Sequence, residues 1–169
     1  NDPFYNEKVR ILLNAIESIV NTRNDIVPVL IADKRNASTN QEVSIDYLKN
    51  KLKTPPIVYK HSDIWETCAL LADLDAVITT KLHVGITSYA FKTKTFGVAA
   101  HQKTKRFYKQ IGKEKYFSDL IDIDNDIKDK LIAFLDDKKY WDNETEVKRN
   151  FLKSQALVCK KEMTEFIKD

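Results

Sequence analysis

Glycine is scarce in this chain of 169 residues, which has glycines only at positions 85, 97 and 112. Neither a Gly-rich dinucleotide loop nor a phosphate loop that ends in Gly-Lys-Ser/Thr can be built from these three residues. A phosphate group would therefore have to be bound by a helix N-terminus and by cationic side chains. The shortage of glycine excludes two common kinds of nucleotide site.

Three further shortages narrow the class of protein. Cysteine occurs twice, at Cys68 and Cys159, without metal-ligand spacing, so we expect two buried, reduced thiols in a cytoplasmic protein. No apolar run approaches the ~20 residues that span a bilayer, and no signal-peptide pattern is present, so we expect no transmembrane segment. The net charge is only +3, which argues against a nucleic-acid partner.

Apolar periodicity predicts an alternation of helices and short buried strands. The predicted strands are residues 28–32, 56–60, 76–79, 95–100 and 117–123. The predicted helices are residues 4–20, 41–53, 62–73, 81–91, 104–111, 125–137 and 144–168, with Asp63 and Glu66 as a capping box for the third.

This alternation, without hairpin signals, predicts an α/β fold: a doubly wound parallel sheet of about five strands with helices on both faces. No linker or repeat divides the chain, so residues 1–169 are expected to form a single Rossmann-like domain. The first element is a helix where a strand is usual, and we therefore expect this domain to be half of something larger.

A polar segment from Thr79 to His83 follows the apolar stretch 75–78, where a strand should end and a helix begin. Ligands of open α/β sheets bind outside the carboxyl ends of strands, and a helix start favours an anion. Lys81 adds a positive charge, Thr79 or Thr80 can cap the helix, and His83 can donate to phosphate or carry a proton. The pattern indicates an anion-binding helix start, against the alternative of a solvated lysine and a packed histidine.

A second cationic group follows the fourth predicted strand and comprises His101, Lys103, Lys105, Arg106 and Lys109. In a parallel sheet this loop could neighbour the loop at 79–83, so that both face one cleft. We interpret Lys105 and Lys109 as solvated. The next segment is acidic, and such segregated charge suits a small anionic ligand better than a long polyanion.

Three aromatic side chains could serve either as sugar-binding platforms or as packing groups. Trp65, Tyr140 and Trp141 all lie in or beside predicted helices. Large aromatic residues at such places more often pack into a core, so we interpret them as packing groups.

Two motifs give the chain a family resemblance. "LADLDAVITTKLHVGITSYAF" and "HQKTKRFYKQIG" together resemble the polysaccharide pyruvyl transferase family. Members carry an acidic residue, an apolar strand, Thr or Ser, and then Arg-Leu-His opening a helix. A later lysine is followed by Phe four residues on and Gly five beyond, a spacing that Lys103, Phe107 and Gly112 reproduce. The resemblance covers about residues 57–123 well.

The resemblance implies two Rossmann-like halves, as in glycosyltransferases of the B type, with the active site between them. This chain is similar to the C-terminal half, so its partner would be an N-terminal domain that is missing from it. The implied reaction transfers pyruvyl from phosphoenolpyruvate, the donor substrate, to a sugar hydroxyl of an envelope or exopolysaccharide glycan. It yields a ketal and phosphate, and no further cofactor or metal is implied.

The resemblance also implies roles for particular residues. Lys81 takes the place of the family arginine that holds the donor's phosphate or carboxylate. His83 matches the family histidine, as a donor contact and as the catalytic general acid. Leu82 contributes packing and its backbone N–H. Thr80, directly before Lys81-Leu82-His83, belongs to the same substrate-binding group, and Lys103 binds an anion at the same cleft.

Three departures from the family pattern lead us to expect that the isolated chain is catalytically inert. Lys81 lacks the bidentate fork of arginine, "FKTKTFGV" replaces a Gly-x-Pro approach to the next strand, and an upstream family arginine is absent. Two other functions stay open at this point. One is half of a sugar-nucleotide glycosyltransferase, and the other is a non-catalytic glycan-binding or assembly domain.

Overall fold

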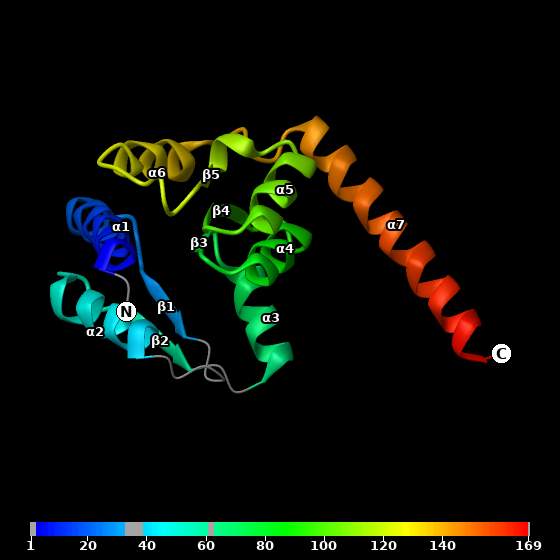
Figure 1. Ribbon diagram of the computed structural model, residues 1–169, viewed down its shortest axis with the longest axis horizontal. Coiled ribbons are helices and arrows are strands. Elements are labelled where there is room, and N and C mark those ends of the chain that lie inside the picture. Colours follow the sequence, from blue (N-terminus) through cyan, green and yellow to red (C-terminus); the bar gives the residue numbers. More distant parts are fainter. Residues whose placement is uncertain (1–2, 33–38, 61–62, 169) are drawn as a thin grey trace.

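The computed structural model describes residues 3–32, 39–60 and 63–168, which form the α/β fold that the sequence predicts (Figure 1). Helices and strands alternate along the chain. The elements are α1 (Pro3–Thr22), β1 (Val29–Ala32), α2 (Thr39–Lys51), β2 (Ile57–Lys60), α3 (Ile64–Asp73), β3 (Ala76–Thr79), α4 (Leu82–Ala90), β4 (Lys94–Val98), α5 (Gln102–Gln110), the 3-10 turn η1 (Glu114–Tyr116), β5 (Phe117–Ser118), α6 (Ile127–Asp136) and α7 (Asn143–Lys168).

In the part of the chain that the structure describes, the strand pairs are parallel, as predicted, but they form two sheets where one was expected. β1 pairs with β2, and β3, β4 and β5 form a second sheet in that order. Each sheet lies beside its own apolar cluster. The smaller cluster, around Val20, Leu48 and Leu52, joins α1 and α2, whereas the main core surrounds the three-stranded sheet.

Strand β4 shows that helices cover both faces of the larger sheet. On one face, Gly97 lies directly against the ring of Tyr108 from α5. On the other face, Phe96 packs edge-on against Phe134 from α6, with ring centroids 5.4 Å apart. Because both faces are covered, the strand is buried along most of its length, as a central parallel strand should be.

The predicted strand 117–123 is wrong beyond its second residue, since β5 ends at Ser118. The carboxylate of Asp119 accepts a hydrogen bond from the N–H of Ile121, and that of Asp124 accepts one from Asp126. These side chains fold the backbone into turns. Leu120 and Ile123 are buried nonetheless, so the apolar pattern reflects a packed turn.

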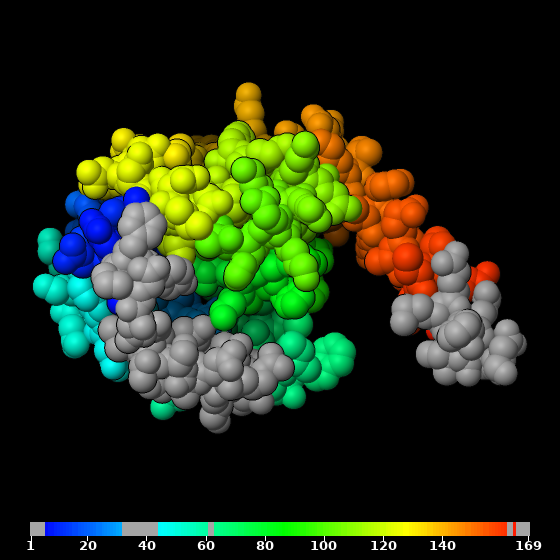
Figure 2. All heavy atoms as spheres, in the orientation of Figure 1, coloured from blue at the N-terminus to red at the C-terminus, as the bar shows by residue number. Residues whose placement is uncertain are grey.

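Helix α7 leaves the body of the molecule, as Figures 1 and 2 show. The carboxylate of Asp142 begins it by accepting hydrogen bonds from the N–H and hydroxyl of Thr145. Cys159 on this helix is exposed and Cys68 is half-buried, so the expectation of two buried thiols is wrong. No helix in the described part of the chain is both long and apolar enough to cross a membrane.

Candidate anion-binding site

The turns that precede α4 and α5 lie side by side at one edge of the larger sheet. β3 and β4 are paired in parallel, with Thr79 opposite Gly97, so their carboxyl ends are neighbours. Helices α4 and α5 begin just after these ends and contact each other. The sequence prediction that the two loops are neighbours is confirmed.

Both helices start at a cationic or titratable residue that does not cap them. Lys81 (φ −108°, ψ 120°) and His101 (φ −111°, ψ 127°) have the extended backbone of an N-cap residue, yet neither side chain makes a capping hydrogen bond. Helix α3 shows the usual arrangement, in which the Asp63 carboxylate accepts hydrogen bonds from the N–H groups of Trp65 and Glu66. The positive ends of α4 and α5 are therefore left without an acceptor from their own N-cap side chains.

The threonines before α4 do not supply the missing cap, contrary to the sequence prediction. The hydroxyl of Thr79 accepts a hydrogen bond from the N–H of Lys81 at 3.0 Å, one residue before the helix begins. Thr80 is exposed. Among the described residues, no hydrogen bond uses the N–H groups of Leu82, His83 or Val84, so these donors are free to bind a ligand.

The side chains that the sequence singled out lie at these helix starts and are accessible. Lys81, His83 and Lys103 are exposed and Leu82 is half-buried. No hydrogen bond or ion pair within the described ranges engages the cationic groups of Lys81 and Lys103 or the His83 ring. Positive side chains therefore add to the fields of two helix dipoles, a combination that attracts an anion.

A buried tyrosine fixes the relative placement of the two helix starts. The Tyr108 hydroxyl forms a 2.8 Å hydrogen bond with the Thr95 hydroxyl of β4, and burial raises the pKa of this tyrosine. A Cβ atom on Gly97 would lie 2.4 Å from the Tyr108 ring, and one on Gly85 would lie 3.4 Å from its hydroxyl. Glycines at these two positions let α4, α5 and β4 approach one another around one ring.

The opposite ends of α4 and α5 share a Schellman motif. In α5, Gly112 has a positive φ of 68° and Lys113 N–H donates to the Tyr108 carbonyl. In α4, Lys92 takes the equivalent position with φ 67°, and Thr93 N–H donates to the Ser88 carbonyl. In α4 a lysine therefore performs a turn that favours glycine.

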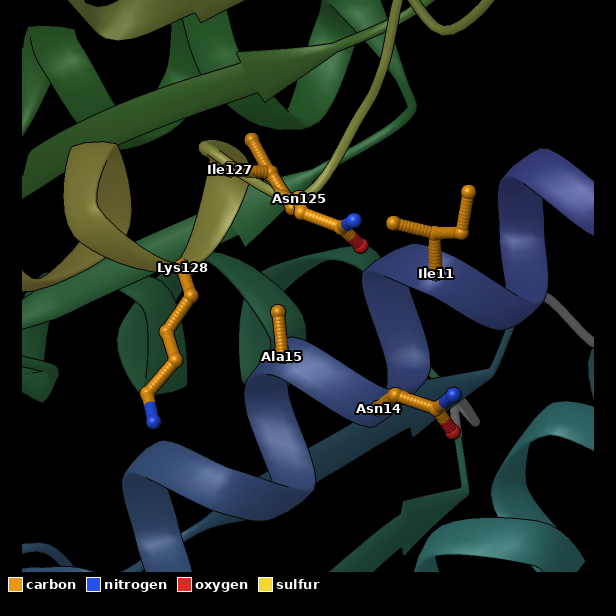
Figure 3. A pocket seen from close by; sticks show the side chains of 6 residues that line it. All are labelled: Ile11, Asn14, Ala15, Asn125, Ile127 and Lys128. Carbon is orange, nitrogen blue, oxygen red and sulfur yellow. The ribbon is translucent and has the colours of Figure 1, made fainter.

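A surface pocket of ≈ 200 Å³ lies elsewhere, between α1 and the start of α6 (Figure 3). Its lining residues are Ile11, Asn14, Ala15, Asn125, Ile127 and Lys128. It contains one cationic side chain, and none of the residues predicted from the sequence lines it. The uncapped helix starts are therefore the better candidate for binding an anion. Within the described residues, no group of three His, Cys, Asp or Glu side chains could hold a metal ion.

The structure changes the interpretation of two residues. His101 was counted only as one of several cationic residues, although it is the N-cap of α5. Trp65 was interpreted as a packing residue but is exposed, whereas Tyr140 is buried and Trp141 half-buried, as predicted. The signal for His101 was its place directly after a buried strand.

The comparison with protein families agrees with the resemblance in the sequence. The family model described as Polysaccharide pyruvyl transferase matches residues 2–102, which is more than half of the chain. The chain therefore belongs to the polysaccharide pyruvyl transferase family. The match includes Thr80, Lys81, Leu82 and His83 and ends one residue before Lys103. Searches of curated proteins and of solved structures found no match.

Proposed function

We propose that this chain is the donor-binding half of a transferase that moves the pyruvyl group of phosphoenolpyruvate onto an envelope or exopolysaccharide glycan. The family implies polysaccharide pyruvyl transfer in general. The observation that carries the assignment of the site is the pair of uncapped helix starts at one sheet edge, with Lys81 and His101 as their N-cap residues.

Phosphoenolpyruvate suits this arrangement because it carries two anionic groups, a phosphate and a carboxylate. One group would accept hydrogen bonds from the free N–H groups at the start of α4, and Lys81 would add a charge-assisted contact. The other would lie toward the start of α5, where Lys103 stands in the first turn. Each helix start would then be satisfied by the ligand in place of a capping side chain.

The chemistry requires an acid and stabilisation of a departing phosphate. Two hydroxyl groups of the acceptor sugar add to C2 of the donor, the C2–O bond to phosphate breaks, and the products are a ketal and inorganic phosphate. Of the two hydroxyl protons, one is matched by the proton that C3 gains, and the other leaves with the released phosphate. His83 would act as the general acid for the enolic carbon or the departing oxygen, and Lys81 would stabilise the phosphate charge.

Titration calorimetry with phosphoenolpyruvate, at low ionic strength, tests this assignment. We expect Lys81→Ala and His83→Ala each to weaken binding about tenfold or more, since a hydrogen bond to a charged group contributes about 1.5–3 kcal/mol. Lys109→Ala is the matched control, because this exposed lysine lies in the last turn of α5, away from the helix start. Unchanged affinity in both site variants would refute the assignment, and binding of a nucleotide sugar in place of phosphoenolpyruvate would favour a glycosyltransferase.

A further inference from the structure

The first turn of α3 presents an exposed indole ring. Trp65 is 79 % exposed, and its neighbour Ile64 is 58 % exposed. In contrast, Trp141 lies 5.2 Å from Tyr89 and 5.1 Å from Tyr140, measured between ring centroids. Trp65 has no ring contact of this kind among the described residues, so the core does not account for it.

The backbone that carries this indole is held firmly. The Asp63 carboxylate accepts a 2.6 Å hydrogen bond from the N–H of Trp65. The Thr67 hydroxyl donates to the Asp63 carbonyl at 2.9 Å and lies 3.2 Å from the Tyr59 hydroxyl of β2. The ring therefore projects from an ordered, capped helix start.

The first turn of α3 lies toward the carboxyl ends of the strands, as the proposed donor site does. Helix α3 has ten residues, or about 15 Å, and β3 has four residues, or about 13 Å. The last turn of α3 lies at the amino ends of β3 and β4, because the Thr93 hydroxyl just before β4 donates to the Leu71 carbonyl at 2.6 Å. Its first turn lies at the other end, after the carboxyl end of β2 and on the side toward the carboxyl end of β3. Helix α4 begins at this end and packs against α3 (Figure 1).

We propose that Trp65 is the stacking platform for a pyranose ring of the acceptor glycan, an inference that rests on the proposed pyruvyl transfer. One face of a pyranose presents C–H groups that pack on an aromatic ring, and an indole offers the largest such surface. The Asp63 carboxylate, which already accepts the hydrogen bond from the Trp65 N–H, can accept a further one from a sugar hydroxyl. The stacked ring would lie beside the donor, whose C2 must meet two of those hydroxyls.

Tryptophan fluorescence of the full chain tests the proposal, with methyl β-D-galactopyranoside and methyl β-D-glucopyranoside as probes. A Trp141→Phe background leaves Trp65 as the only indole. We expect at least one glycoside to quench its emission and shift it to shorter wavelength. In the wild-type background, Trp65→Ala should weaken binding of that glycoside, followed by saturation-transfer NMR, about tenfold, or about 1.4 kcal/mol. Trp65→Phe should retain most of the affinity.

The control is Phe91→Ala, which removes an aromatic ring that is 45 % exposed at the far end of α4 and should leave glycoside binding unchanged. Wild-type glycoside affinity in Trp65→Ala, no response to either glycoside, or a blue shift caused by self-association alone would overturn the proposal. Calorimetry with phosphoenolpyruvate separates the two claims. If Trp65→Ala keeps donor affinity but loses glycoside affinity, both stand. If the chain binds glycoside through Trp65 but does not bind phosphoenolpyruvate, only the proposed function fails.

Discussion

Replacing Lys81 by serine should stabilise the free protein and weaken donor binding at the same time. The backbone at position 81 already has N-cap geometry, and the N–H groups of the first turn of α4 are free. A serine hydroxyl could accept a hydrogen bond from one of them, which stabilises a helix by about 1 kcal/mol. Removing a cation from the positive end of the helix dipole adds about 0.3–1 kcal/mol.

The expected gain is therefore about 1–2 kcal/mol in the free energy of unfolding. For a chain of this size it corresponds to a rise in Tm of roughly 2–8 °C, measured by calorimetry or circular dichroism. Lys81→Ala separates the two contributions, because alanine removes the charge without supplying a cap. Phosphoenolpyruvate affinity should fall about tenfold or more in both variants, since each loses the charge-assisted contact.

The opposite signs of the two effects are what the reasoning requires. A lysine at the N-cap weakens its own helix, and its presence there is explained if a ligand supplies the missing acceptor. A fall in Tm for Lys81→Ser would show that the lysine supports the fold, and unchanged donor affinity would show that the uncapped end has no role in binding.

Three further predictions concern the Schellman turn, the pH dependence of stability and the activity of the chain. In denaturant melts, Lys92→Gly should have a free energy of unfolding about 1 kcal/mol higher than Lys92→Ala. Both variants lose the 2.8 Å ion pair with Glu146, but only glycine adopts the positive φ without strain. Equal stability of the two variants would contradict this. The hydrogen bond from the Tyr116 hydroxyl lowers the pKa of Asp137 from 3.8 to about 2. The ionised Asp137 therefore contributes about 1–2 kcal/mol to the free energy of unfolding above pH 4, and this contribution is lost as the pH falls toward 2. Asp137→Asn should flatten this part of the pH–stability curve, and an unaltered curve would refute the linkage. The isolated 169-residue chain should release no phosphate from phosphoenolpyruvate in the presence of a glycan acceptor, and detectable pyruvyl transfer would show that it needs no second half.

The order of elements could be read from the sequence because short apolar runs and polar breaks mark buried parallel strands clearly. The predicted strand 76–79 coincides with β3, and the positive φ of Gly112 ends α5 one residue past its C-cap. The strand predicted at 117–123 was too long because aspartate side chains that hydrogen-bond nearby N–H groups turn the backbone, while the apolar residues between them are still buried.

Two features of the site depend on where a helix begins, and apolar periodicity does not fix that point. Thr79 or Thr80 was expected to cap a helix beginning at residue 81, but α4 begins one residue later, at Leu82, and leaves Lys81 as the N-cap. Trp65 stands six residues before the buried Leu71, about 120° around α3 from it, and this offset places the indole off the buried face. The helical phase could have indicated its exposure, whereas its place relative to the strand ends required the fold.

The central claim is that an anionic donor binds at the uncapped starts of α4 and α5. Amide chemical shifts in a ¹⁵N-labelled chain, titrated with phosphoenolpyruvate, test it most directly. The account predicts that the N–H signals of Leu82, His83 and Val84 move most, together with those of Gln102 and Lys103, and that Lys81→Ala reduces these shifts. Shifts confined to the pocket between α1 and α6, around residues 125–128, or no shifts at all, would contradict it.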